Sequence, residues 1–370
     1  MEFSRDSDNF FVKWFRSLDK IIIVLLIIWI LAGLLFCTTT TLSFASEKLY
    51  DNPNVLIIKY YFFIAFGLLV VFLTSLFNEV FYKEFGKYIL LISVIFLVFT
   101  LIFGVEVKGS KRWINLFFFN FQPIELVKPA LVVFLAKIFS SDDSYSFKFL
   151  FSGFLTSIII CVLLLQPDYT QSLLILSAWL TLIFMSGLNL ILIFTILGFS
   201  MIFMGSVLFF FKSNFSYIFT RFDKWIDTTD ISFQSEKALD AIVHGGFFGR
   251  GIGEGILKEK IPESHTDYVL ASISEEFGII AVIVILFVVF SLFMRVFAIC
   301  QTDISKFKKY TLTTLSTLVL LQIFINVGVT INLMPSTGMP FSFLSYGGSS
   351  ILTSSIIMGI ILSLTKNKHS

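Results

Sequence analysis

Long uncharged apolar runs constrain the fold of this chain more than any other feature of its sequence. Stretches 21–41 and 188–211 contain no charged residue, and a run of about 20 such residues forms a helix that crosses roughly 30 Å of hydrocarbon. Charged residues make up only 14% of the sequence, whereas soluble domains carry roughly 25%. A soluble protein with a large core is therefore excluded, and we expect an all-α, polytopic integral membrane protein.

The apolar runs predict about ten transmembrane helices, separated by short polar joints. We expect them at approximately 21–45, 57–78, 87–105, 123–140, 148–166, 169–187, 188–211, 268–298, 310–334 and 344–365. They form one membrane domain over residues 21–365, between short tails at 1–20 and 366–370. The polar start of the chain and the lack of a small-residue cleavage site argue against a cleavable signal peptide.

The distribution of Lys and Arg predicts the orientation of these helices. If the N-terminus is cytoplasmic, most Lys and Arg residues fall on the inner side, as the positive-inside rule requires. Both termini are then cytoplasmic. Three polar segments lie on the outer side: 106–122, the long segment 212–267, and 335–343. The long segment mixes charges with Phe and Trp, which suits a position against the headgroup layer, with Trp225 as an interfacial anchor.

Half of the residues in 244–255 are glycine. Dense glycine permits positive φ angles and close backbone approach to a ligand, and its N–H groups can bind phosphate. A flexible loop with a chance cluster of glycines is an equal alternative. Because no Lys-Ser or Lys-Thr ending follows, the segment does not predict a nucleotide site.

Glu263, His265 and Asp267 come directly before the helix expected at 268–298. An Asp in this place is often only a helix N-cap. Here, however, two carboxylates and a histidine lie close together at the N-terminal end of a helix, on the outer side of the membrane. A partly desolvated carboxylate has a raised pKa, which suits a general base.

Glu125 and Lys128 lie on one face of the helix expected at 123–140. Ionisable groups inside a membrane are costly and usually face a cavity or each other. They form either a self-neutralising structural pair or part of a substrate groove. Lys108, Lys111 and Arg112 precede them on the same outer side, and clustered cations suit a pyrophosphate headgroup. We therefore favour the groove.

Other polar positions predict no chemistry by themselves. Gln166-Pro-Asp168 has ordinary turn residues, and the small residues of 345–350 favour tight helix packing. Three cysteines match no metal-ligand spacing and are expected to pack in the core.

Together these stretches resemble the SEDS family (shape, elongation, division and sporulation proteins). The motifs that carry the resemblance occur in family order over residues 20–365: Lys111-Arg-Trp-Ile114, Gln122-Pro with Glu125 and Lys128, Gln166-Pro-Asp168, Gly245-Gly with Gly249, Gly251 and Gly253, Pro262-Glu with His265-Thr-Asp267, Glu275-Glu-Phe-Gly278, Asn326-Val-Gly328, and Ser345-Tyr-Gly-Gly-Ser-Ser350. Ser349-Ser350 looks more like the division branch than the elongation branch.

The resemblance implies a peptidoglycan glycosyltransferase that polymerises lipid II and releases undecaprenyl pyrophosphate. Asp267 matches the essential carboxylate of the family and would be the catalytic base. The candidate substrate-binding residues are Lys111, Arg112, Glu125, Lys128, Glu263 and His265. No cofactor is expected to be required, although a divalent cation (Mg or Mn) could assist.

The resemblance also implies a setting and partners. The chain would work in the bacterial cytoplasmic membrane, at the division septum, with a class B penicillin-binding protein transpeptidase and other divisome membrane proteins. Nucleic acid is not expected as a partner. Two alternatives stay open: a lipid II flippase and a non-catalytic scaffold for the transpeptidase. A flippase predicts charged residues deep in several helices, yet most of the expected spans contain none.

Overall fold

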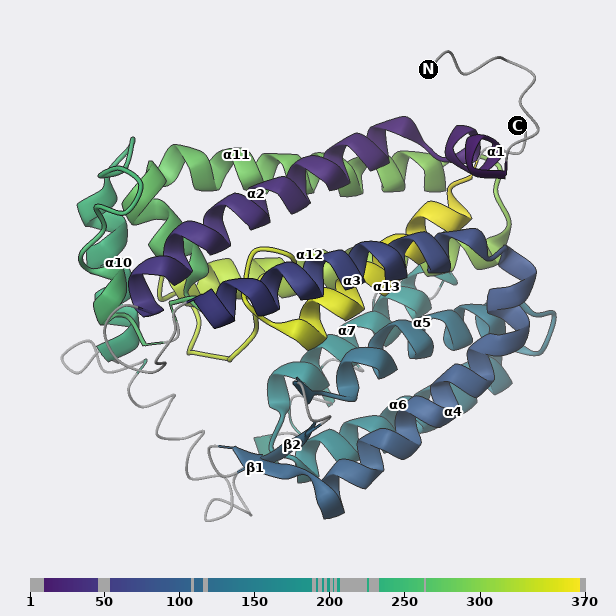
Figure 1. Cartoon of the computed structure of the whole chain (residues 1–370). Helices are drawn as coiled ribbons and strands as arrows, with labels where there is room; N and C mark the ends of the chain where they lie inside the picture. Colours follow the sequence, from purple (N-terminus) through teal and green to yellow (C-terminus); the bar gives the residue numbers. More distant parts are fainter. Residues whose placement is uncertain are drawn as a thin grey trace.

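The computed structural model describes residues 10–45, 54–107, 110–115, 119–187, 233–262 and 264–366, with a few single positions between 191 and 225. Most of the described helices pack lengthwise into a bundle (Figure 1). The helix expected at 188–211 lies almost entirely outside the described residues.

Every other expected helix has a counterpart. These helices are α2 (Lys20–Ala45), α3 (Asn54–Leu76), α4 (Glu79–Phe103), α5 (Ile124–Ser140), α6 (Tyr145–Leu165), α7 (Tyr169–Met185), α11 (Val269–Cys300), α12 (Lys306–Thr330) and α13 (Gly348–Leu364). Among the described residues, six helices are long and apolar enough to cross a membrane, and α7 and α13 are shorter apolar helices. The predicted all-α, multi-pass membrane fold is confirmed.

Several shorter elements were not expected from the apolar runs. They are α1 (Phe10–Ser17), α10 (Phe233–Gly245), the 3-10 turn η1 (Lys258–Lys260), and the strands β1 (Val105–Val107), β2 (Ser110–Asn115) and β3 (Asn120–Phe121). The strands pair antiparallel in the order β1-β2-β3. The described strands of the predicted outer segment 106–122 are therefore successive antiparallel neighbours, whose main-chain groups bond each other.

Helix α12 lies at the centre of the bundle. In its most apolar window 67% of the residues are buried, against 28% in α4 and 22% in α6. Helix α12 contacts α5, α7, α11 and α13, whereas α4 and α6 expose many large apolar side chains. The exposed faces of α4 and α6 suit contact with lipid.

The two ends of the bundle are formed by different elements. At one end Trp14 on α1 donates to Ser75 on α3 at 3.0 Å, and Arg295 on α11 pairs with Asp19 at 2.7 Å. The opposite end contains α10, the strands β1 and β2, and the first turns of α11 (Figure 1). The predicted outer segments around 106–122 and 233–267 thus share one end of the molecule.

Candidate active site

The glycine-rich segment after α10 completes helix α11 where that helix is interrupted. Gly278 has φ 83° and ψ 166°, so the N–H groups of the next two residues cannot donate to carbonyls four residues earlier. The N–H of Ile279 donates instead to the carbonyl of Gly246 at 3.0 Å. The N–H of Ile280 donates to Phe247 at 3.4 Å. The loop supplies the acceptors that the kink removes.

The same loop supplies the missing donors. The carbonyl of Glu275 accepts from the N–H of Arg250 at 2.9 Å, and that of Glu276 from Gly251 at 3.0 Å. This approach requires glycine at Gly249, where φ is +79° and an added Cβ would lie 2.2 Å from the Glu276 carbonyl oxygen. Gly245 is as close, with an added Cβ 2.0 Å from the Ser274 carbonyl oxygen, so these two glycines allow the loop to pack closely on α11.

The glycine-rich region does bind an anion, but the anion belongs to the chain itself. The carboxylate of Glu275 is fully buried. Three consecutive main-chain N–H groups donate to it, at 3.1 Å from Ile256, 2.8 Å from Leu257 and 2.6 Å from Lys258. The His244 ring nitrogen Nδ1 lies 3.0 Å from the same carboxylate. Within the glycine-rich segment itself, the N–H groups of Arg250, Gly251 and Gly253 also donate to α11, which argues against the phosphate-binding alternative for this loop.

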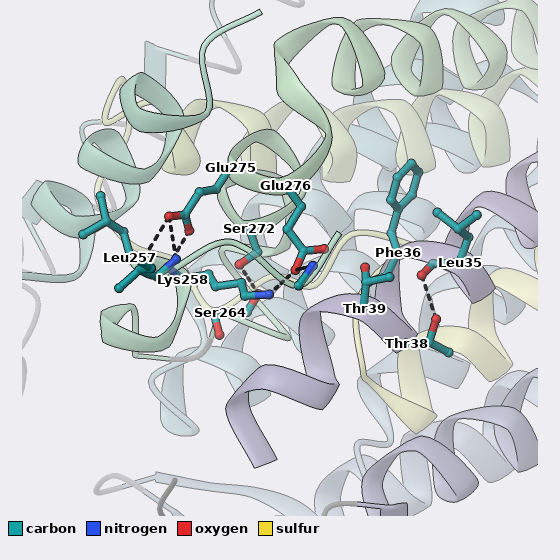
Figure 2. A network of polar contacts seen from close by, with 12 residues as sticks. Leu35, Phe36, Thr38, Thr39, Leu257, Lys258, Ser264, Ser272, Glu275 and Glu276 are labelled. Carbon is teal, nitrogen blue, oxygen red and sulfur yellow. Dashed lines mark hydrogen bonds and ion pairs between the residues drawn. The ribbon is translucent and has the colours of Figure 1, made fainter. Parts of the chain in front are cut away.

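Lys258 and Glu276 form a buried ion pair beside this carboxylate. Both side chains are about 1% exposed or less, and their charged ends point toward one another between the loop and α11 (Figure 2). The N–H of Gly253 approaches Glu276 Oε1 at 3.4 Å. Two glutamates and one lysine therefore fasten the segment 250–260 to the first half of α11.

Asp267 lies just before α11, on a segment held by its main chain. The helix begins at Val269, with Tyr268 as the N-cap residue and no side-chain cap. The carbonyl of His265 accepts from the N–H of Tyr346 at 2.8 Å, and that of Thr266 from the Ser345 hydroxyl. Asp267 is half-buried. It lies at the N-terminal end of α11 but is not the N-cap residue.

Helix α12 holds this segment from the bundle side through two amides one turn apart. Asn326 donates to the main-chain carbonyls of Asp267, at 3.0 Å, and of Met339, at 2.7 Å. Gln322 donates to the carbonyl of Pro340 at 3.0 Å. Both amide side chains are buried. The loop at 335–345 and the Asp267 segment are therefore attached to the same helix.

Glu125 and Lys128 form a second buried ion pair, within α5. Lys128 Nζ lies 2.8 Å from Glu125 Oε1, and the two side chains are 0% and 3% exposed. Gln171 on α7 donates to the same Glu125 oxygen at 3.2 Å, and Lys128 donates to Gln322 at 3.4 Å. The pair joins α5, α7 and α12, and through Gln322 it reaches the loop beside Asp267.

Arg112 on β2 contacts the turn between α6 and α7. Its guanidinium donates to the carbonyls of Gln166, at 3.0 Å, and Pro167, and lies 3.7 Å from the Asp168 carboxylate. Burial raises the pKa of Asp168, while the Arg112 charge acts to lower it. Gln122 donates to Asp168 at 3.1 Å. The residues of this turn thus form a buried polar cluster and not a plain exposed turn.

The expected site residues fall into two groups. Glu125, Lys128 and Arg112 lie in one connected polar cluster, while Asp267 and His265 lie on the segment that α12 attaches to it. Lys111 is exposed on β2. Glu263 and Lys108 lie outside the described residues.

Sequence reasoning assigned no role to the two amides of α12, although Asn326 lies in one of the motifs of the family resemblance. Gln322 and Asn326 stand one turn apart in a buried apolar helix, and that spacing was the available signal. It also gave Asp168 no role beyond a turn, and it missed the buried glutamates 275 and 276 as anchors for the glycine-rich loop.

Within the described residues, no group of three or more His, Cys, Asp and Glu side chains could hold a metal ion. A divalent cation in the reaction stays a prediction.

The fold and this site define a multi-pass membrane protein with a half-buried carboxylate and a buried polar network at one end of its helix bundle. A family model described as cell cycle protein, covering FtsW, RodA and SpoVE, matches residues 19–370. The chain belongs to this family, as the SEDS resemblance predicted.

Curated relatives cover nearly the whole chain. A protein named probable peptidoglycan glycosyltransferase FtsW from Haemophilus influenzae is 30% identical, over 98% of this chain and 95% of its own length. A protein with the same name from Trichlorobacter lovleyi is 31% identical, over 95% of both. The predicted likeness to the division branch agrees with these names.

Solved structures share the fold. A chain from a structure titled "Structural coordination of polymerization and crosslinking by a peptidoglycan synthase complex" matches with a TM-score of 0.77. It is 22% identical and covers 94% of this chain and 98% of its own. The rod shape determining protein RodA of Thermus thermophilus matches with a TM-score of 0.70 and 22% identity, over 96% of this chain and 98% of its own.

Proposed function

We propose that this protein is a peptidoglycan glycosyltransferase, which polymerises lipid II into glycan strands at the outer face of the cytoplasmic membrane during cell division. The observation that carries the proposal is the near full-length similarity to proteins named FtsW, at 30% identity over 98% of the chain. The position of Asp267 at the N-terminal end of α11 fits this reaction.

The proposed chemistry uses the carboxylate of Asp267, a half-buried residue whose main chain is held in place. The hydroxyl oxygen of an acceptor sugar attacks the anomeric carbon of the donor, and the bond from that carbon to the pyrophosphate oxygen breaks. Asp267 takes the hydroxyl proton, and undecaprenyl pyrophosphate leaves with the bonding electrons. A carboxylate in reach of the attacking hydroxyl speeds such a step by roughly 10²–10⁴-fold.

The leaving pyrophosphate needs positive charge. Lys111 is exposed at the same end of the molecule, and Arg112 is partly exposed beside the turn at 166–168. They are the better placed of the expected cations, because the Lys128 ammonium is fully buried against Glu125 and Gln322. Lys128 would reach a phosphate only if the bundle opened around it. Cations at a developing anion act most strongly where water is excluded.

The partner and the setting belong to the same proposal. A transpeptidase of the penicillin-binding protein class is the proposed partner, since a structural relative comes from a peptidoglycan synthase complex. We further propose that both termini are cytoplasmic and that the protein acts at the division septum. The concentration of Lys and Arg near the α1 end of the bundle supports this orientation.

The decisive experiment is polymerisation of purified lipid II by the purified chain, with and without its transpeptidase partner. Asp267→Asn should abolish glycan product without changing membrane insertion or thermal stability. Asp240→Asn, at an exposed carboxylate on α10, is the control and should keep wild-type activity. Substantial product from well-folded Asp267→Asn protein would remove Asp267 as the base.

Cysteine labelling tests the orientation. Lys258 is unsuitable as an outer marker, because its side chain is 1% exposed and a label could not reach it. Phe248 is 84% exposed in the same segment, and Lys306 is exposed at the start of α12. We expect cysteine at 248 to react from outside and cysteine at 306 only after the membrane is opened. The reverse result would contradict the proposed site.

A further inference from the structure

Asn326 bridges two main-chain segments beside the Asp267 carboxylate. Its side chain is 1% exposed on the central helix α12. One amide nitrogen donates to two main-chain carbonyls from segments far apart in sequence, Asp267 at 3.0 Å and Met339 at 2.7 Å. Polar side chains are costly inside a membrane bundle, so these two bonds account for an amide at this position.

The orientation of the amide follows from its partners. Both partners are carbonyl oxygens, which only accept hydrogen bonds, so the NH₂ end must face them. An NH₂ group has two hydrogens, one for each carbonyl. Side chains with a single donor, or with none, cannot bridge the two segments in the same way.

The bridge fixes the surroundings of the Asp267 carboxylate. Met339 follows Gly338, where φ is +74° and an added Cβ would lie 3.8 Å from Asp267 Oδ2. The loop at 338–339 therefore borders the space in front of the carboxylate. The main chains of His265 and Thr266 are held from Tyr346 and Ser345, whereas Asn326 bonds Asp267 itself. Asn326 thus fixes the main chain of Asp267 relative to this loop.

We propose that Asn326 is a positioning residue for Asp267, which holds the carboxylate and the 338–339 loop in the geometry that proton transfer requires. The inference rests on the proposed function. Asn326 acts through Asp267 and does not touch the substrate. A displacement of the base by about 1 Å can reduce turnover on the order of 100-fold, while substrate binding would be unchanged.

The test compares Asn326→Ala and Asn326→Ser with wild-type protein, in lipid II polymerisation with the partner present. Both variants lose the bridge, and the smaller change to Ser leaves less empty volume. We expect the kcat of the folded protein to fall roughly 10- to 100-fold with KM unchanged, alongside a moderate loss of thermal stability from the two lost hydrogen bonds. Thr330→Val is the matched control on α12, because the buried Thr330 hydroxyl donates only to the carbonyl of its own helix at Asn326. It should keep wild-type kcat.

The outcomes separate the two proposals. If wild-type protein with its partner makes no glycan, the proposed function fails, and this inference fails with it. If wild-type protein is active and a folded Asn326 variant keeps its kcat, only the inference is wrong. Failure of both variants to fold, or a loss of activity no larger than the unfolded fraction accounts for, would make Asn326 structural and would also overturn the inference.

Discussion

Two buried lysine–glutamate pairs in this protein use the same chemistry for different ends. Glu125 and Lys128 stand three residues apart on one helix, with amides from α7 and α12 around them. Lys258 and Glu276 are 18 residues apart and join a loop to α11. The first pair is formed by local helix geometry, whereas the second exists only when two segments have come together.

The difference lies in what remains when one partner is removed. Glu125 would keep the Gln171 amide at 3.2 Å. Glu276 would keep only the long contact from the Gly253 N–H, at 3.4 Å, because its other carboxylate oxygen has no hydrogen-bond partner in the structure. The second pair should therefore be the more costly one to break, since an unpaired buried charge carries a large desolvation penalty.

Lys258→Met should have the largest effect on stability. It leaves Glu276 buried without its counter-charge, at a cost of roughly 3–5 kcal/mol, so we expect little folded protein in the membrane. Fluorescence-detected size exclusion and thermal unfolding in detergent measure this. Lys260→Met changes an exposed lysine two positions away and should be neutral. Equal stability of the two variants would show that the Lys258 pair does not anchor the loop.

Lys128→Ala should cost somewhat less, about 3 kcal/mol at the lower end of the range for buried pairs, because Gln171 remains to contact Glu125. The double change Glu125→Ala with Lys128→Ala removes both charges and should restore stability. We expect this double variant to be folded but inactive in glycan synthesis, because the pair is connected through Gln322 to the loop beside Asp267. Recovery of both stability and activity would make the pair purely structural.

Two glycines with similar backbone angles sharpen the view of the loop as a part packed on α11. Gly249 has φ +79° and Gly253 has φ +81°, but an added Cβ would meet the Glu276 carbonyl only at Gly249; at Gly253 it meets nothing within 4 Å. Gly253→Ala should cost about 1 kcal/mol from backbone strain alone. Gly249→Ala should cost about 2 kcal/mol more from overpacking. Thermal unfolding compares them, and equal losses would contradict the close packing.

The sequence predicted local features well. Each helix found among the described residues at an expected range corresponds to a largely apolar stretch. Such a stretch spans hydrocarbon as a helix, because a helix satisfies its own main-chain groups. The Glu125–Lys128 pair also followed from spacing alone, since residues three apart share a helix face.

The features that sequence reasoning missed depend on contacts between distant segments. The glycine-rich stretch suggested either a flexible loop or a phosphate site, whereas its N–H groups bind the carbonyls at the Gly278 kink. The N–H groups that follow it bind the Glu275 carboxylate. Helix α10 was missed because it is not an apolar run of the length that a membrane span needs. The bonds of Asn326 to Asp267 and Met339 join residues up to 59 positions apart, which no local pattern reveals.

The smallest expected effect tests whether the main chain or the side chain holds Glu275. His244 contacts the carboxylate at 3.0 Å, but its side chain is 32% exposed and water can take its place. Three main-chain N–H groups remain on Glu275 when the imidazole is removed. His244→Ala should therefore cost about 1 kcal/mol, the net value of one hydrogen bond, and thermal unfolding should register only a small shift. A loss as large as that of Lys258→Met would mean that the histidine, and not the loop backbone, holds the buried carboxylate in place.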